Sequence, residues 1–112
     1  MRVLVVEDHT DVLETVSDLL RDIGISVVGA VSIQVAGAFL ATEDWDIVLS
    51  DMLFPGTLTG LDLAEPAIAR GIQIIIMSAN VDERAQVEAR GLCFLAKPFR
   101  RAELLAALEL AA

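Results

Sequence analysis

Apolar residues along the chain gather in short runs that are separated by longer amphipathic stretches. Near-continuous apolar runs of strand length occupy residues 2–6, 46–50, 72–77 and 92–96. Such runs are typical of strands that are covered on both faces, because neither face then meets water. A fifth run, residues 25–30, is weaker and contains Gly29, which suits a strand at the edge of a sheet.

Between these runs, apolar residues recur at the spacing of amphipathic helices. The expected helices cover residues 10–23, a segment capped by Ser32, and about residues 61–70, 80–90 and 101–111. Asn80 followed by Glu83 matches a capping box at the start of the fourth helix. Pro66 lacks a backbone N–H, so we expect it to kink or shorten the third helix.

The order of these elements is a strand followed by a helix, five times over. Strands that are linked by helices run parallel, and right-handed crossovers place the helices on both faces of one sheet. The pattern therefore predicts an α/β fold, a (βα)5 doubly wound parallel sheet. Five such units account for all 112 residues, so we expect a single domain over residues 1–112.

Polar side chains follow each central strand of the predicted sheet. Glu7 and Asp8 follow the first strand, Asp51 the third, Ser78 the fourth and Lys97 the fifth. Each of these residues alone is an ordinary helix cap or loop residue. Because ligands bind beyond the carboxyl ends of parallel strands, the joint pattern predicts one site at this edge of the sheet.

The chemistry of these side chains indicates a divalent cation and a phosphoryl group. Three neighbouring carboxylates repel one another unless a cation lies among them, and oxygen ligands favour Mg²⁺. A carboxylate beside such an ion can attack phosphorus and carry an acyl phosphate. Lys97 would offset part of the negative charge, and the Ser78 hydroxyl could donate to a phosphoryl oxygen.

Composition excludes several classes of function. Hydrophobic residues make up 55% of the chain, which excludes intrinsic disorder. Seventeen acidic and eight basic residues give a net charge of −9, so we expect no direct binding of nucleic acid. No signal peptide or run of membrane-spanning length is present, and Cys93 is the single cysteine, so we expect a cytoplasmic protein without membrane insertion.

Four segments, VVEDH, LSDMLFPG, IIIMSAN and FLAKPF, resemble the receiver domain of two-component response regulators over essentially the whole chain. The resemblance implies the flavodoxin-like winding, with strand order 2-1-3-4-5. It also implies a signalling module that is not an enzyme and that has no effector domain on this chain. Its phosphodonor would be the phosphohistidine of a sensor histidine kinase or of a histidine phosphotransfer protein.

The resemblance assigns the residues of a phosphorylation site. Asp51 would accept the phosphoryl group, and Lys97 would contact that group. Asp8 and Asp51 would bind Mg²⁺ directly, together with the backbone carbonyl of Leu53, while Glu7 would act through water. His9, directly after the acidic pair, is interpreted as an exposed residue that opens the first helix.

The resemblance also assigns a switch. Ser78 would be the hydroxyl that moves toward the phosphoryl group, and Phe94 the aromatic residue that follows it inward. The Lys97–Pro98 peptide bond is expected to be cis. Phosphorylation would then alter the surface formed by the fourth helix, the fifth strand and the fifth helix, to control a partner or output that the sequence does not identify.

Two other functions are compatible with this fold class. A flavin-binding electron-transfer domain would need a phosphate loop rich in hydroxyls and amides after the first strand, where Glu7 and Asp8 stand instead. A phosphatase with an aspartyl nucleophile often carries a second acid two residues further on, and here that residue is Leu53. Neither is favoured.

Overall fold

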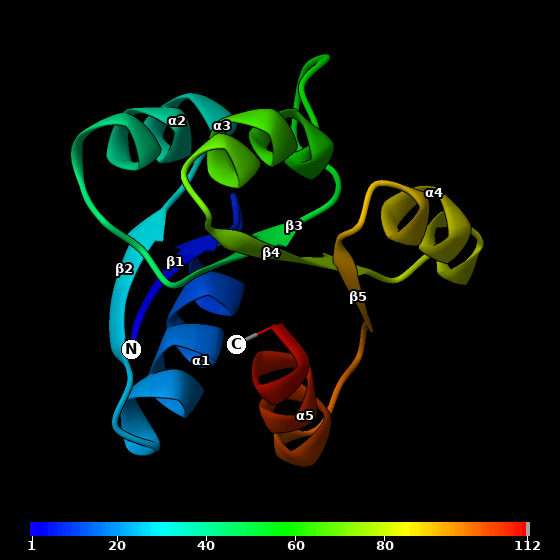
Figure 1. Ribbon diagram of the computed structural model, residues 1–112. Coiled ribbons are helices and arrows are strands. Elements are labelled where there is room, and N and C mark those ends of the chain that lie inside the picture. Colours follow the sequence, from blue (N-terminus) through cyan, green and yellow to red (C-terminus); the bar gives the residue numbers. More distant parts are fainter. Residues whose placement is uncertain (112) are drawn as a thin grey trace.

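The structure is a computed structural model, and it describes residues 1–111. Within these residues, five parallel strands form one sheet (Figure 1). They are β1 (Arg2–Val6), β2 (Ser26–Ala30), β3 (Ile47–Asp51), β4 (Gln73–Ser78) and β5 (Cys93–Ala96). The strand order is β2-β1-β3-β4-β5, which confirms the expected winding and places the weak second strand at an edge.

Helices cover both faces of the sheet, as Figure 1 shows. They are α1 (Thr10–Asp22), α2 (Ile33–Thr42), α3 (Ala64–Ala69), α4 (Arg84–Ala89) and α5 (Arg101–Ala111). Side chains of α1 and α5 share one core with Val3 and Val5, whereas α2, α3 and α4 share the other with Leu4 and Val6. This division follows from the strand geometry, because successive side chains point to opposite faces.

The central strands β3 and β4 include the polar residue that follows each apolar run. β3 continues to Asp51, which is paired with Met77, and β4 continues to Ser78, which is paired with Ala96. Backbone hydrogen bonding does not depend on side-chain polarity, so the ladder extends past the apolar run. Asp51 and Ser78 are therefore the last residues of strands and are held by the sheet itself.

The third and fourth helices are short and begin differently from the prediction. The 3₁₀ turns Gly60–Leu63 and Val81–Glu83 precede α3 and α4. Pro66 is the third residue of α3, in the first turn, where an N–H has no partner within the helix, so it costs no helical hydrogen bond there; the helix, Ala64–Ala69, is shorter than the predicted residues 61–70.

The predicted capping box of the fourth helix is wrong. The Asn80 side chain does cap the turn, because its Oδ1 accepts a hydrogen bond from the Asp82 N–H at 3.0 Å. The Asn80 N–H, however, donates to Ser78 Oγ at 3.0 Å, and the Glu83 carboxylate accepts from the Ser78 hydroxyl. The buried hydroxyl thus takes both groups that a capping box would join to each other.

Two further features bear on the expectations from the sequence. The Lys97–Pro98 peptide bond is cis. Among residues 1–111, no helix has the length and apolar character that crossing a membrane requires.

Candidate phosphorylation site

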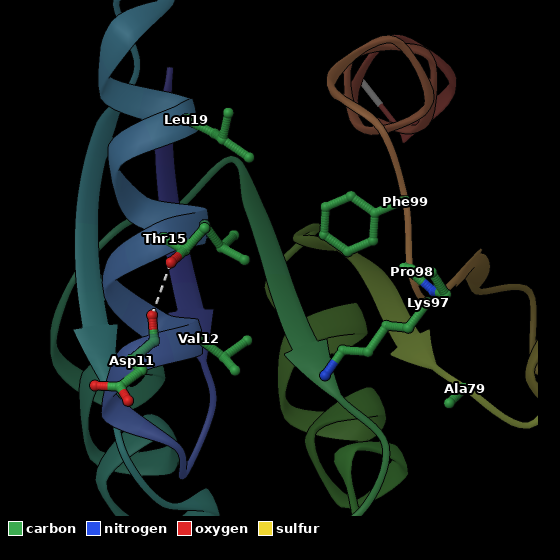
Figure 2. Close-up of a pocket in the computed structure, with 9 residues that line it drawn as sticks. Asp11, Val12, Thr15, Leu19, Ala79, Lys97, Pro98 and Phe99 are labelled. Atoms are coloured by element: carbon green, nitrogen blue, oxygen red, sulfur yellow. Dashed lines mark hydrogen bonds between the residues drawn. The ribbon is translucent and has the colours of Figure 1, made fainter.

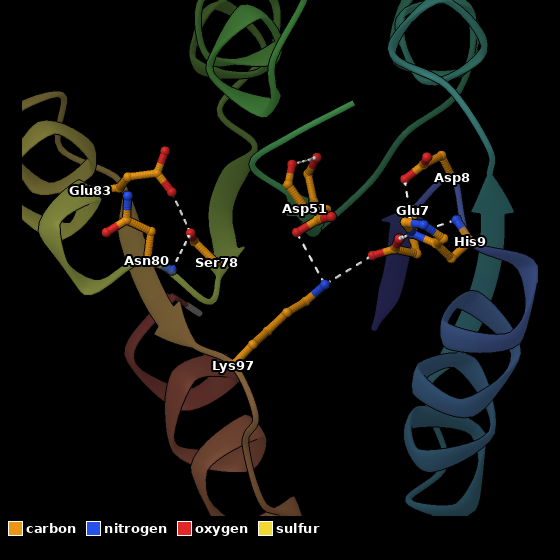
Figure 3. A network of polar contacts seen from close by, with 9 residues as sticks. Glu7, Asp8, His9, Asp51, Ser78, Asn80, Glu83 and Lys97 are labelled. Atoms are coloured by element: carbon orange, nitrogen blue, oxygen red, sulfur yellow. Dashed lines mark hydrogen bonds and ion pairs between the residues drawn. The ribbon is translucent and has the colours of Figure 1, made fainter. Parts of the chain in front are cut away.

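The carboxyl ends of the central strands bring acidic and basic side chains together (Figure 3). Lys97 extends from the end of β5 to the ends of β1 and β3. Its Nζ lies 3.1 Å from Glu7 Oε2 and 3.1 Å from Asp51 Oδ1. Residues that are 44 and 90 positions apart from Glu7 in the sequence thus meet in one ion-paired group. We call Glu7, Asp8, His9, Asp51 and Lys97 the charged site.

Burial and mutual charge set the protonation of this group. Burial, followed by the negative charge of Glu7, raises the pKa of Asp51, although Lys97 opposes this. Burial alone would also raise the pKa of Glu7, which is fully buried, but hydrogen bonds with His9 and Lys97 outweigh it and lower that pKa. Burial alone would lower the pKa of Lys97, but Asp51 and Glu7 outweigh it, so Lys97 stays charged.

Asp8 carries a buried oxygen that makes no hydrogen bond. Within residues 1–111, Asp8 Oδ1 is the buried side-chain atom that makes no hydrogen bond. A buried carboxylate oxygen that accepts no hydrogen bond is costly, so such an atom points to a ligand. Single ligand atoms of Glu7, Asp8 and His9 lie within 4.8 Å of one another, which suits a cation. Carboxylate oxygens are the donors that Mg²⁺ prefers, so the residues present fit this ion.

His9 is a member of the site that the sequence did not reveal. Its side chain is 73% exposed and it directly precedes α1, as interpreted from the sequence. However, its Nδ1 also lies 3.0 Å from Glu7 Oε1 and 3.3 Å from Asp8 Oδ1. The hydrogen bond with Glu7, followed by the charge of Asp8, raises the pKa of His9. Its position directly after two acids was the available signal.

Asp51 and Lys97 both line a cavity of about 330 Å³. The lining residues are Asp51, Met52, Leu53, Ser78, Ala79, Asn80 and Lys97. The structure therefore groups four of the predicted site residues, Asp51, Leu53, Ser78 and Lys97, around one cavity. Asp8 lines a separate cavity of about 550 Å³ with the start of α2 and residues 54–58.

The two predicted switch residues both contact the start of α4. The Ser78 hydroxyl donates to the Glu83 carboxylate and accepts from the Asn80 N–H. The half-buried ring of Phe94 packs on the core that α2, α3 and α4 share, and the Arg84 guanidinium lies 4.8 Å from the ring centroid. The sequence analysis assigned Glu83 to a capping box and did not identify Arg84; the contacts of these residues with Ser78 and Phe94 leave no periodic signal.

An apolar groove of about 500 Å³ lies beside the charged site, between α1 and residues 97–99, which lead into α5 (Figure 2). Val12, Leu19, Pro98 and Phe99 are among its lining residues. Figure 2 shows the Lys97 side chain extending from the cis-proline end of this groove. The groove thus supports the stem of Lys97, whose ammonium group reaches the two carboxylates.

The sequence of residues 3–109 matches the response regulator receiver domain. The chain belongs to this family. Receiver domains are signalling modules, and the match favours this class over the flavin-binding and phosphatase functions that the same fold class allows.

Known relatives support the assignment. The chain is 30% identical to the transcriptional regulatory protein DltR of Streptococcus agalactiae, over 98% of this chain and 51% of DltR. It therefore spans about half the length of this relative. The receiver domain of the sensor histidine kinase PA1611 from Pseudomonas aeruginosa, solved with a magnesium ion in its active-site cleft, is 28% identical, with a TM-score of 0.84 over 97% of this chain and 94% of that one.

A more distant structure shares the fold. The response regulator TrrA from Thermotoga maritima, solved in complex with Mg²⁺ and beryllofluoride, superposes with a TM-score of 0.89 at 23% identity, over 99% of this chain and 98% of that one.

Proposed function

We propose that this chain is a phosphoacceptor module in which Asp51 receives a phosphoryl group in the presence of Mg²⁺. The observation that carries the proposal is the shared ion pair, in which the Lys97 ammonium lies 3.1 Å from both Asp51 and the buried Glu7. This arrangement holds a carboxylate at the mouth of a cavity and places a fixed positive charge beside it. An acyl-phosphate site needs both features.

The transfer step uses one carboxylate oxygen of Asp51 as the nucleophile. That oxygen forms a bond to phosphorus while the bond from phosphorus to the donor's imidazole nitrogen breaks, and the electron pair of the broken bond stays on that nitrogen. The product is a mixed anhydride of the Asp51 carboxylate and phosphate. Lys97 keeps its proton, because its two carboxylate neighbours hold its pKa up, and so it offsets the negative charge of the incoming group.

Four residues would hold the metal ion. Asp8 and Asp51 would contribute carboxylate oxygens and Leu53 its backbone carbonyl, with Glu7 acting through water. The buried Asp8 Oδ1 that makes no hydrogen bond supports this assignment. When bound, Mg²⁺ supplies positive charge that stabilises the phosphoryl oxygens. His9 lies against Asp8 and Glu7, so it is part of the wall of this site.

The response to phosphorylation involves Ser78 and Phe94. A phosphoryl group adds about −1.5 to −2 charges and three acceptor oxygens next to the cavity that Ser78 lines. The Ser78 hydroxyl turns toward these oxygens, and the Phe94 ring moves into the space that the loop leaves. The surface formed by α4, β5 and α5 then changes and acts on a partner.

The phosphodonor is a sensor histidine kinase or a histidine phosphotransfer protein. The similarity to a receiver domain of a sensor histidine kinase supports this choice. DltR is named a transcriptional regulatory protein, and about half of its length lies outside the matched region. The output of the present module therefore belongs to a partner or to a further part of a larger protein.

Incubation with acetyl phosphate and Mg²⁺, followed by intact-mass measurement, tests the proposal. We expect the wild type to gain the mass of one phosphoryl group, and to lose this gain when EDTA is present. Asp51→Asn should gain nothing. Asp18→Asn, which changes an exposed carboxylate of α1, serves as the matched control and should react like the wild type. Equal gains in wild type and Asp51→Asn would refute the assignment.

A further inference from the structure

The hydrogen bonds of Ser78 point away from the phosphoacceptor. Ser78 is the last residue of β4, and it is 3% exposed. It lines the same cavity as Asp51, yet its hydroxyl donates to the Glu83 carboxylate and accepts from the Asn80 N–H. Figure 3 shows Ser78 between Glu83 and Asn80 on one side and Asp51 on the other.

A serine hydroxyl has a single proton to donate. While that proton is given to Glu83, it cannot be given to a group that is attached to Asp51. Hydrogen bonds to an ionised carboxylate are about twice as strong as those between neutral groups, so Glu83 is an effective competitor. A phosphoryl group on Asp51 must therefore displace Glu83 before Ser78 can bond to it.

The local structure holds Glu83 in this position. The 3₁₀ turn Val81–Glu83 reverses the chain after β4, so that a residue five positions after Ser78 returns to it. The Asn80 side chain closes the turn by accepting from the Asp82 N–H at 3.0 Å. The contact between Glu83 and Ser78 is therefore built from one side-chain cap and one short turn, and Glu83 is partly buried.

We propose that Glu83 is a positioning residue that holds the Ser78 hydroxyl away from Asp51 in the unphosphorylated chain. This inference rests on the proposed function of Asp51 and Ser78. Loss of the hydrogen bond between Ser78 and Glu83 frees the 3₁₀ turn that precedes α4. This helix is held to the core by one buried residue, Val87. The competition for one proton thus links the charge at Asp51 to the position of α4.

The same turn also reaches the second switch residue. Arg84 directly follows Glu83, and its guanidinium lies 4.8 Å from the centroid of the Phe94 ring. Movement of Glu83 therefore also moves the group that covers Phe94.

The affinity for beryllofluoride, a non-covalent analogue of a phosphoryl group on a carboxylate, tests the proposal. It is measured by ¹⁹F NMR titration in the presence of Mg²⁺. Glu83→Ala should bind about 5–10-fold more tightly than wild type, because Ser78 no longer has a competing acceptor. Glu83→Gln keeps a neutral acceptor and should lie between the two. Glu88→Ala removes an exposed glutamate from the same helix and is the matched control, with an affinity within about twofold of wild type.

The same titration in the Ser78→Ala background separates the hydrogen bond from a simple charge effect. We expect the Glu83→Ala gain to vanish there, because no hydroxyl remains to be released. A gain that persists in that background, or one that Glu88→Ala reproduces, overturns the role of Glu83 and leaves the phosphoacceptor site intact. Absence of saturable, Asp51-dependent binding by the wild type overturns the proposed function, and this inference with it.

Discussion

The two sides of Asp51 are built in different ways. On one side, the charged site stands on the ends of β1, β3 and β5, and Lys97 ties Asp51 to the fully buried Glu7. On the other side, Ser78 is bonded to the start of α4, a six-residue helix behind a 3₁₀ turn.

The difference separates chemistry from response. Reacting atoms need fixed distances, and residues at the ends of central strands provide them. A surface that must change needs low local stability, and a short helix with little buried area provides that. Asp51 therefore lies between the strand-borne charged site and the cavity that Ser78 also lines. Each of the following predictions acts on one side of this comparison.

The largest effect is expected on the strand-borne side, from Lys97→Ala. Removal of the ammonium group takes away the fixed positive charge beside Asp51, so the rate of phosphorylation by acetyl phosphate should fall about 10²–10³-fold. Lys97→Arg keeps the charge on a planar group of different shape, so its rate should lie between those of Lys97→Ala and the wild type. Time courses of intact mass provide both rates. A rate for Lys97→Ala within threefold of wild type would contradict the role of this lysine.

The packing below Asp51 is tested by Gly60→Ala. A Cβ at Gly60 would overlap the Asp51 backbone carbonyl and would lie 3.0 Å from Ile76 Cδ1, so the free energy of unfolding should fall by about 1–3 kcal/mol. Gly37→Ala in α2 is the matched control, because nothing lies within 4 Å of its added Cβ. Gly37→Ala should raise the free energy of unfolding by about 0.5–1 kcal/mol, because alanine is favoured over glycine inside a helix. Urea unfolding measures both, and similar values for the two variants would disprove the tight approach.

Asp51→Asn should raise the stability of the metal-free protein at pH 7. Burial and the charge of Glu7 raise the pKa of Asp51 above its ordinary value of 3.8, so the folded chain holds this proton more tightly than the unfolded chain. The free energy of unfolding therefore falls as the pH rises through the folded pKa. Asparagine does not ionise, and we expect a gain of about 0.5–2 kcal/mol at pH 7 that shrinks as the pH falls toward 3.8.

Thermal unfolding in EDTA at a series of pH values measures this gain. Asp18→Asn, at an exposed carboxylate, should show no such trend. A loss of stability in Asp51→Asn at pH 7 would mean that Lys97 stabilises the Asp51 charge by more than burial and Glu7 cost.

The smallest effect is expected on the α4 side, from Arg84→Ala. The guanidinium lies over the Phe94 ring at an exposed position, where such contacts contribute about 0.5–1 kcal/mol. Arg90→Ala, an exposed arginine at the other end of α4, is the control for the loss of charge. We expect a lower melting temperature for Arg84→Ala than for Arg90→Ala. Equal melting temperatures would show that the contact of Arg84 with Phe94 contributes nothing to stability.

The fold can be predicted from the sequence because buried strands have a distinctive pattern of apolar residues. Near-continuous apolar runs can form only where both faces of a sheet are covered, and the helical stretches between them require parallel pairing. The hydrogen-bond ladder extends past the apolar runs to Asp51 and Ser78, whatever the polarity of their side chains.

The site was predictable only as far as the topology dictates it. Glu7, Asp51 and Lys97 meet because parallel strands end at the same edge, and this follows from the order of elements. The contact of His9 with Glu7 depends on a side-chain rotamer, and the bond from Ser78 to Glu83 depends on a turn. The spacing from Asn80 to Glu83 suits a capping box equally well, so the pattern alone could not decide which N–H and carboxylate would pair.

The most direct test of the central claim is to locate the phosphoryl group on the chain. Borohydride reduces an acyl phosphate to an alcohol, so a phosphorylated aspartate becomes homoserine at its own position, and peptide mass spectrometry identifies that position. After treatment with acetyl phosphate and Mg²⁺, we predict homoserine at position 51 in the wild type. Homoserine at Asp8 or at any other carboxylate, with position 51 unchanged, would contradict the account.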